Sequence, residues 1–243
     1  MTSTDTTIGP PGVALLAAEW RAPLEAWLGL MAWPWLRRSP RGDGHAVLVL
    51  PGLGGSDLST LLLRRFLKAQ GWQPHGWELG RNLGPRQGLF PSLAQRLSDL
   101  QTVSQRRVSL VGWSLGGVFA RELAKQHPAA VRQVVTLGSP LPLHHRATNV
   151  RRLYECLAGD RAYPPELMAR LSDPLPAQVP CTSIYSRSDG IVHWRASLLP
   201  KSERTENIRV SASHSGMGFS PLALRILADR LAQREDDWQP YRN

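Results

Sequence analysis

A serine flanked by glycines, at the point where one periodic pattern gives way to another, constrains the fold of this chain more than any other feature. Residues 112–117 read Gly-Trp-Ser-Leu-Gly-Gly. The apolar run at 108–112 predicts a buried strand, and the pattern at 115–126 predicts a helix. Between a strand and a helix, G-x-S-x-G predicts a sharp turn with small neighbours. Such a turn would lift the Ser114 hydroxyl clear of the sheet edge and place it at a helix N-terminus.

Short apolar runs alternate with helical patterns along most of the remaining chain. We expect strands at 46–50, 72–79, 108–112, 131–137, 181–185 and 207–210, and helices at 58–69, 90–100, 115–126 and 221–233. This alternation predicts an α/β fold, with a mostly parallel central sheet and helices on both of its faces. The long interruption at about 141–180 is interpreted as a small cap insertion over the carboxyl edge of the sheet.

The N-terminal residues lie outside this alternation. Residues 1–10 read as a polar tail, and a helical period with one apolar face follows at 13–31, which we expect Pro34 to end. Its apolar positions are Val13, Leu16, Trp20, Leu24, Trp27 and Met31. We therefore expect two units. One is a tail with a Trp-rich amphipathic helix at 1–44, and the other is an α/β domain at 45–243 that carries the cap insertion.

A glycine-rich loop at 51–55, Pro-Gly-Leu-Gly-Gly, follows the first predicted strand of the sheet. Acyl transfer places negative charge on a carbonyl oxygen, and two preorganised backbone N–H groups can receive it. Leu115 follows the serine directly, and Leu53 lies in the loop, so their amides are candidates for an oxyanion hole. The alternative is a plain glycine-rich turn. A phosphate loop is excluded because the chain has no G-x-x-x-x-G-K-[ST] pattern.

An acid and a histidine complete the candidate constellation. Asp189 follows the strand at 181–185 in a glycine turn, where a triad acid could reach a histidine, although it could instead cap the turn. Asp160 and Asp173 lie in the insertion and are weaker candidates. His214 lies in the loop between the last strand and the last helix, which gives the chain order Ser114, Asp189, His214. The other histidines occupy less suitable places: His45, His75, His127, His144, His145 and His193.

These motifs resemble the α/β-hydrolase superfamily, and more narrowly the small bacterial triacylglycerol lipases and esterases. The resemblance spans roughly residues 45–233 and is carried by 51–55, 108–117, Asp189 and His214. The segments at 70–72, 135–140 and 182–186 are also similar to that group. The sequence departs from the pattern at Pro51, where many relatives have histidine, and at Trp113, which also occurs in some carboxylesterases that act on acyl-carrier esters.

The resemblance implies a carboxylic ester hydrolase that uses a Ser114–His214–Asp189 triad and an acyl-enzyme, without a metal or an organic cofactor. Two other functions stay open. One is an acyltransferase with the same triad, and the other is a non-catalytic binding protein of the same fold. Apolar residues of the insertion could line an acyl pocket for medium-chain or long-chain esters, or could form the core of the cap. They include Leu141, Leu153, Tyr154, Leu167 and Met168.

The formal net charge of +10 comes almost entirely from arginine. Two interpretations stay open: an arginine-rich genome, or a surface that attracts anionic lipid or an acidic carrier protein. We expect a small-molecule or lipid ester as the partner and no nucleic acid, because the chain has no dense Lys/Arg run with interleaved aromatic residues. Cys156 and Cys181 lack metal-ligand spacing, and are interpreted as free thiols or a single disulfide.

The apolar stretch at 12–36 is interrupted by charged residues and prolines, so it predicts neither a secretory signal nor a membrane span. We therefore expect a cytoplasmic protein. The helix at 13–31 has two interpretations. It could pack on the hydrolase body, or its tryptophans and the following Arg37 and Arg38 could make peripheral contact with a membrane through residues 13–38.

Overall fold

A six-stranded parallel sheet organises the part of the chain that the structure, a computed structural model, describes: residues 8–141, 147–149 and 175–242. The strand order is β2-β1-β3-β4-β5-β6. The bounds are β1 Ala46–Leu50, β2 Gln73–Gly76, β3 Val108–Trp113, β4 Val131–Leu137, β5 Cys181–Ser186 and β6 Thr205–Val210. Every neighbouring pair is parallel, which confirms the predicted sheet.

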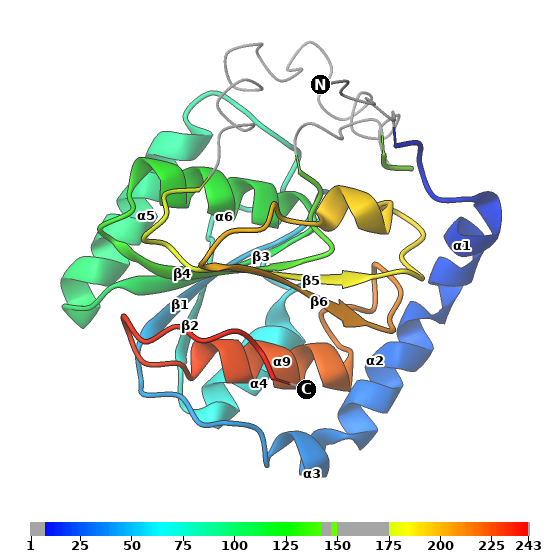
Figure 1. Cartoon of the computed structure of the whole chain (residues 1–243), viewed down its shortest axis with the longest axis horizontal. Coiled ribbons are helices and arrows are strands. Elements are labelled where there is room, and N and C mark those ends of the chain that lie inside the picture. Colours follow the sequence, from blue (N-terminus) through cyan, green and yellow to red (C-terminus); the bar gives the residue numbers. More distant parts are fainter. Residues whose placement is uncertain (1–7, 142–146, 150–174, 243) are drawn as a thin grey trace.

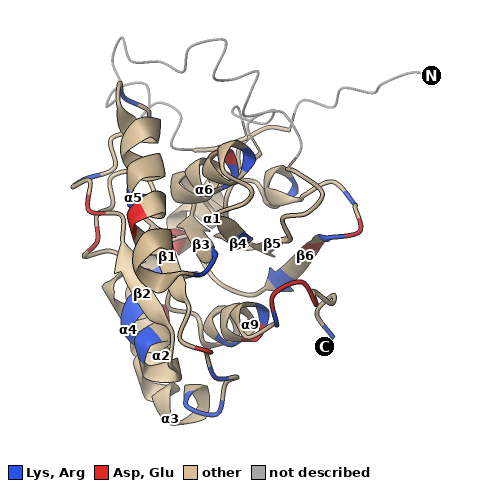
Figure 2. Cartoon of the chain, turned by 90° about the vertical axis from the view of Figure 1, so that its left-hand side faces the viewer, with Lys and Arg blue, Asp and Glu red and all other residues tan. Residues whose placement is uncertain are grey.

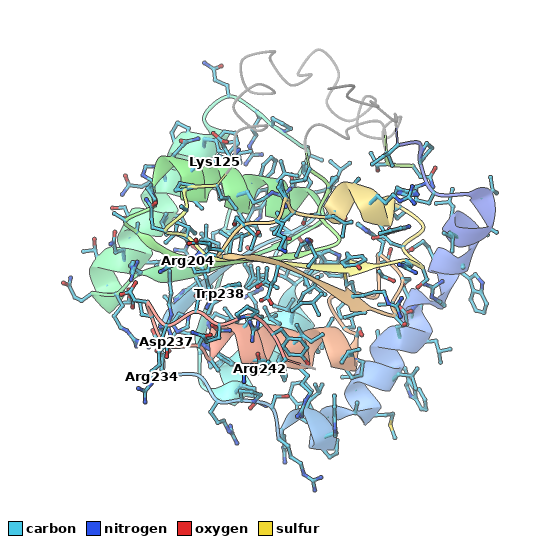
Figure 3. All side chains as sticks on the ribbon, in the orientation of Figure 1. Lys125, Arg204, Arg234, Asp237, Trp238 and Arg242 are labelled. Atoms are coloured by element: carbon cyan, nitrogen blue, oxygen red, sulfur yellow. The ribbon has the colours of Figure 1, made fainter. Side chains whose placement is uncertain are left out.

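Helices cover both faces of this sheet, as the alternating pattern predicts. Figure 1 shows α5 and α6 on one face and α4 and α9 on the other. Their bounds are α4 Leu61–Gln70, α5 Leu89–Ser104, α6 Leu115–Gln126 and α9 Pro221–Leu231, and a 3₁₀ turn, η4, spans Trp194–Ser197. Side chains from both faces of the sheet fill the layers beneath the helices (Figure 3).

The central strands are apolar along their whole length because both of their faces are covered. Neighbouring residues of β1 point into different layers. Leu48 belongs to the core cluster that contains Phe119 of α6, whereas Val49 belongs to the cluster that contains Phe66 of α4. All residues of β1, β3 and β4 are buried, while β2 and β6, at the two edges of the sheet, are partly exposed. This rigid sheet fixes where the loops at its carboxyl edge begin.

The N-terminal helix is broken, and the prediction that it runs unbroken to Pro34 is wrong. The segments are α1 Val13–Ala17, the 3₁₀ turn η1 Ala18–Arg21, α2 Ala22–Met31 and α3 Trp33–Leu36. Pro23 and Pro34 each lie in the first turn of a helix, α2 and α3 respectively. Proline has no N–H to donate and its φ angle suits a helix start, so each proline begins a new segment.

Several predicted boundaries move by a few residues, for physical reasons. Helix α4 ends at Gly71, as predicted, because Gly71 adopts a left-handed φ of 103°. Strand β2 ends at Gly76, before the predicted residue 79, because the amides of Trp77 and Glu78 donate to the carboxylate of Asp57 at 2.9 and 3.1 Å.

Most of the predicted cap insertion lies outside the described residues, and so does Cys156. Cys181 is a free, buried thiol within β5.

Candidate active site

The predicted site residues lie in loops that follow four different strands. The loop at 51–55 follows β1, Ser114 follows β3, Asp189 follows β5 and His214 follows β6. Because all strands run parallel, these loops share the carboxyl edge of the sheet, where sites of open α/β sheets form. In Figure 1 the arrowheads of β5 and β6 point toward α1 and α2, so the N-terminal helices lie beside this edge.

Ser114 occupies a sharp turn between β3 and α6. Its φ of 52° and ψ of −122° are rare for a residue with a side chain, and its amide donates to the Leu137 carbonyl at 2.8 Å. The flanking glycines leave room for this turn. A Cβ on Gly112 would lie 2.3 Å from the Cα of Gly117, and a Cβ on Gly116 would lie 2.2 Å from the carbonyl oxygen of Leu50. The structure therefore explains why both positions are glycine.

Asp189 and His214 form a buried pair. Nδ1 of His214 lies 2.7 Å from Oδ2 of Asp189, while Oδ1 of Asp189 accepts the amides of Ile191 and Val192 at 2.9 and 2.7 Å. Burial alone would lower the pKa of His214, but the charge and hydrogen bond of Asp189 and the charge of Glu19 raise it above its usual value. The carboxylate therefore fixes the imidazole and favours its protonated form.

The structure brings His214 and Asp189 together, and it leaves the Ser114 hydroxyl without a hydrogen bond to any described residue, His214 included. The serine turn and the histidine loop are nevertheless in contact. The indole Nε1 of Trp113 donates to the backbone carbonyl of His214 at 3.1 Å. Hydrogen bonds between a nucleophile and its base are often long without substrate and shorten in the complex.

The glycine-rich loop lies against Ser114. A Cβ on Gly52 would lie 3.2 Å from the Cβ of Ser114. The amides of Leu53 and Leu115 make no hydrogen bond with other described residues. The loop that carries Leu53 thus lies beside the serine, and Leu115 follows the serine directly.

Asn82 fixes this loop, and sequence reasoning missed it. Its side chain donates to the Pro51 carbonyl at 2.8 Å, its own carbonyl accepts the Gly54 amide at 2.6 Å, and its amide donates to the Gly55 carbonyl at 2.7 Å. Asn82 is fully buried. An asparagine in a polar, glycine-containing stretch reads as an ordinary loop residue, so the sequence offers no signal that it braces a neighbouring loop.

Two carboxylates of the N-terminal helices were also missed. Glu19 accepts the amides of Gly190, His214 and Ser215 at 2.9, 2.8 and 2.9 Å. Burial would raise the pKa of Glu19, but these backbone hydrogen bonds lower it below its usual value. Glu25 accepts the Ser213 amide at 2.9 Å. Their only signal in the sequence is that they interrupt an otherwise apolar stretch.

Arg21 completes this N-terminal group. Its guanidinium donates to the carbonyl of Ser188 at 2.8 Å and to the carboxylate of Glu25 at 3.0 Å. The segment therefore contacts residues on both sides of Asp189 and on both sides of His214. The interpretation that the helix packs on the body is confirmed for this polar face.

A second Ser–His–Asp arrangement lies at the opposite edge of the sheet. His45 Nε2 is 2.8 Å from the Ser109 hydroxyl, and His45 Nδ1 contacts the Asp43 carboxylate. His45 and Ser109 are fully buried at the amino ends of β1 and β3, so no substrate reaches them. Burial, more than any partner, lowers the pKa of His45 to about 4. This cluster is structural, as expected for a histidine that precedes a predicted strand.

No group of three or more His, Cys, Asp or Glu side chains suited to a metal ion occurs within the described ranges. Nor does any helix of those ranges combine the length and the apolar character needed to cross a membrane.

Known proteins with similar sequence and structure agree with this architecture. The α/β-hydrolase fold family matches residues 90–155. The Mus musculus serine hydrolase BPHL is 36% identical over 110 residues, which are 40% of this chain and 37% of that protein. The chain thus matches little more than a third of the length of this curated relative.

Solved lipase structures extend the likeness to most of the chain. The mature Bacillus licheniformis lipase BlEst2 has a TM-score of 0.58 at 18% identity, covering 80% of this chain and 94% of that one. Aspergillus fumigatus lipase B has a TM-score of 0.59 at 18% identity, covering 78% of this chain and 53% of that one. The resemblance expected from the sequence is confirmed, and the chain has the α/β-hydrolase fold.

Proposed function

We propose that this chain is a serine hydrolase that cleaves carboxylic esters through an acyl-enzyme on Ser114. The observation that carries the proposal is the buried 2.7 Å pair of His214 and Asp189 at the same sheet edge as Ser114, with its strained φ of 52°. A carboxylate that holds Nδ1–H leaves Nε2 as the proton acceptor. In this proposal His214 therefore carries its proton on Nδ1, which is the tautomer that the reaction requires.

In the first half-reaction His214 takes the proton of the Ser114 hydroxyl while Oγ bonds to the ester carbonyl carbon. The carbonyl electron pair moves onto oxygen, where the amides of Leu53 and Leu115 would receive the charge. The intermediate then collapses. The bond between the acyl carbon and the alcohol oxygen breaks, and His214 gives its proton to the departing alkoxide.

In the second half-reaction water replaces the alcohol. His214 accepts a proton as the water oxygen attacks the acyl carbon, and it returns that proton to Ser114 Oγ when the carboxylic acid leaves. Throughout, Asp189 keeps its charge and stabilises the imidazolium. Both halves balance without an external oxidant, reductant or cofactor.

The names of similar proteins support this reaction class. The mouse relative is named a serine hydrolase, and both fold neighbours are named lipases. We therefore propose medium-chain or long-chain carboxylic esters, including lipid esters, as substrates. The apolar residues on which a chain-length preference would depend lie mostly in the insertion outside the described residues.

The test is labelling with a fluorophosphonate probe, followed by a p-nitrophenyl ester panel of increasing chain length. Ser114→Ala should abolish labelling and reduce ester turnover by several orders of magnitude. Ser109→Ala is the matched control, because Ser109 also contacts a histidine but is buried at the opposite edge. Retained labelling of Ser114→Ala would refute the proposal, as would a dominant acylated product when a competing alcohol is supplied.

A further inference from the structure

An ordinary surface helix buries its apolar side chains and exposes its charged ones. The N-terminal segment, defined here as residues 12–38, has the opposite orientation. Glu19, Arg21 and Glu25 face the catalytic loops, as their hydrogen bonds show. The large apolar side chains face outward, and in Figure 3 side chains along the outer edge of α1 and α2 project away from the body. Those exposed are Val13, Leu16, Trp20, Leu24, Trp27, Leu28, Leu30, Met31 and Trp35.

This apolar outer face, made of those nine residues, is strongly exposed. Trp20 is 79% exposed, Met31 62% and Trp27 56%. Single exposed apolar residues are common, but a continuous row along consecutive helices marks a surface that meets a partner. The predicted amphipathic face thus exists, but it is turned toward solvent.

The charge around the apolar outer face is positive. The exposed charged side chains of the segment are Arg37 and Arg38, and the exposed Arg41 follows. Asp43, which is also exposed, is paired with Arg106 and Arg132. The guanidinium of Arg225 also lies 5.0 Å from the ring centre of Trp35. Figure 2 shows further Lys and Arg positions on α4, and α3 contacts α4 through the ring pair of Trp33 and Phe66. The acidic residues of the segment, Glu19 and Glu25, are turned inward and accept backbone amides of the site loops.

We propose that the apolar outer face docks onto the surface of an anionic lipid bilayer. Exposed tryptophans sit well at the boundary between headgroups and acyl chains, and flanking arginines attract anionic headgroups. A second copy of the chain fits less well, because it would bring the same arginines together. The segment lies in the plane of the interface, since its helices are too short to cross the bilayer.

Co-sedimentation with vesicles tests this docking. One vesicle set contains phosphatidylcholine alone, and the other contains phosphatidylcholine mixed with phosphatidylglycerol. The unmodified chain should prefer the anionic vesicles. The double variant Trp20→Ser/Trp27→Ser should bind about tenfold more weakly or worse. Arg37→Gln/Arg38→Gln should lose about fivefold for each arginine, and only on anionic vesicles.

Leu58→Ser and Val103→Ser are matched controls, because these residues are 76% and 84% exposed but lie outside the segment. Both should bind like the unmodified chain. Equal binding by the double tryptophan variant would overturn the proposal. So would a dimer in solution that the tryptophan substitutions convert to monomers, because the face would then join two copies.

A separate observation carries a second proposal, which rests on the proposed function. We infer that Glu19 is a positioning residue for the acid and the base. Its carboxylate accepts amides from Gly190, next to Asp189, and from His214 and Ser215. It therefore joins the two loops that carry the buried pair. Its negative charge also acts on the His214 imidazole, together with that of Asp189.

Glu19→Gln tests this role, because the amide has the same shape but presents hydrogens to some of the backbone N–H groups. We expect kcat/KM to fall about tenfold to hundredfold while KM changes little. The midpoint of the acidic limb of kcat/KM should also move to lower pH, because a negative charge near His214 is lost. A purely structural role would not shift that midpoint.

Glu206→Gln is the matched control, because the Glu206 carboxylate accepts the Tyr241 amide at 2.7 Å and lies at the start of β6, away from the site. It should keep kcat/KM and the midpoint. If Glu19→Gln matches the unmodified chain while Ser114→Ala is inactive, the positioning role is wrong and the proposed function stands. If the unmodified chain is neither labelled nor active, the proposed function fails instead.

Discussion

The indole of Trp113 donates a hydrogen bond to the backbone carbonyl of His214 at 3.1 Å, although 101 positions separate the two residues. The same ring packs edge-on against Phe219, with ring centres 5.5 Å apart, and a Cβ on Gly218 would lie 2.5 Å from it. The residue before Ser114 therefore braces the loop that carries His214. This gives a physical reason for the tryptophan that departs from the family pattern in the sequence.

Trp113→Phe should separate this brace from core packing. Phenylalanine keeps an aromatic ring but cannot donate to His214, so we expect kcat/KM to fall roughly tenfold and the free energy of unfolding to fall by about 1–2 kcal/mol. Ester kinetics and urea unfolding measure the two effects. Trp72→Phe is the control, because Trp72 is buried but its Nε1 has no partner within the described residues. It should lose similar stability and keep its activity, and equal activity loss in both variants would contradict the brace.

Gly138 lies where a side chain would disturb the buried pair. It has a left-handed φ of 55°, and its Cβ would lie 3.0 Å from Asp189 Oδ2 and 3.1 Å from His214 Nδ1. Gly138→Ala should therefore push the acid and the base apart and reduce kcat/KM about hundredfold. Steady-state ester hydrolysis measures this change.

The control for Gly138 is Gly88→Ala. Gly88 has a φ of 79°, and its Cβ would meet nothing within 4 Å. Both substitutions carry the backbone cost of a left-handed alanine, about 1 kcal/mol. Only Gly138→Ala should lose activity, so a similar kinetic loss at Gly88 would attribute the effect to backbone strain.

The buried cluster at the amino edge predicts a loss of stability in acid. Burial lowers the pKa of His45 from 6.5 to about 4. Between these values the unfolded chain binds a proton that the folded chain does not, so stability present above pH 6.5 is lost as the pH falls toward 4. We expect about 3 kcal/mol from this residue across that window.

Urea unfolding at several pH values compares the unmodified chain with His45→Gln. The variant should be less stable near neutral pH, because it loses the bond to Ser109, and its stability should fall less steeply in acid. Identical slopes would mean that His45 takes up its proton in the folded state as readily as in the unfolded chain.

Much of the fold can be predicted from the sequence, because the local pattern of apolar residues agrees with the burial that the fold gives them. The run at 46–50 is apolar throughout and becomes a strand buried on both faces, and Gly71 ends α4 because only glycine takes that backbone angle without cost. The glycines around Ser114 predict its turn for the same reason. These are features that neighbouring residues alone determine.

The hydrogen bonds that hold the site loops cannot be predicted from the sequence, because they join distant parts of the chain. Glu19 and His214 are 195 positions apart, and Asn82 reaches the Pro51 loop from a separate segment. The outward orientation of the N-terminal helices has the same origin. Their apolar period leaves two orientations open, packing on the body or facing outward. The loops beside them offer amides, so the carboxylates turn inward and the apolar side chains face solvent.

The electrostatics of His214 predict the acidic limb of the activity profile. Burial alone would lower the pKa of this imidazole, but the charge and hydrogen bond of Asp189 and the charge of Glu19 raise it above 6.5. A proton on Nε2 prevents His214 from accepting the serine proton, so kcat/KM should fall as the pH decreases through the raised pKa. The midpoint should therefore lie above pH 6.5, in ester hydrolysis and in fluorophosphonate labelling alike.

His193→Gln is the control, because the pKa of His193 is lowered, chiefly by burial, and that residue has no part in the pair. This variant should leave the midpoint in place. A midpoint below the ordinary histidine pKa in the unmodified chain would contradict the prediction, because burial would then outweigh the effect of the two carboxylates on the pKa of His214.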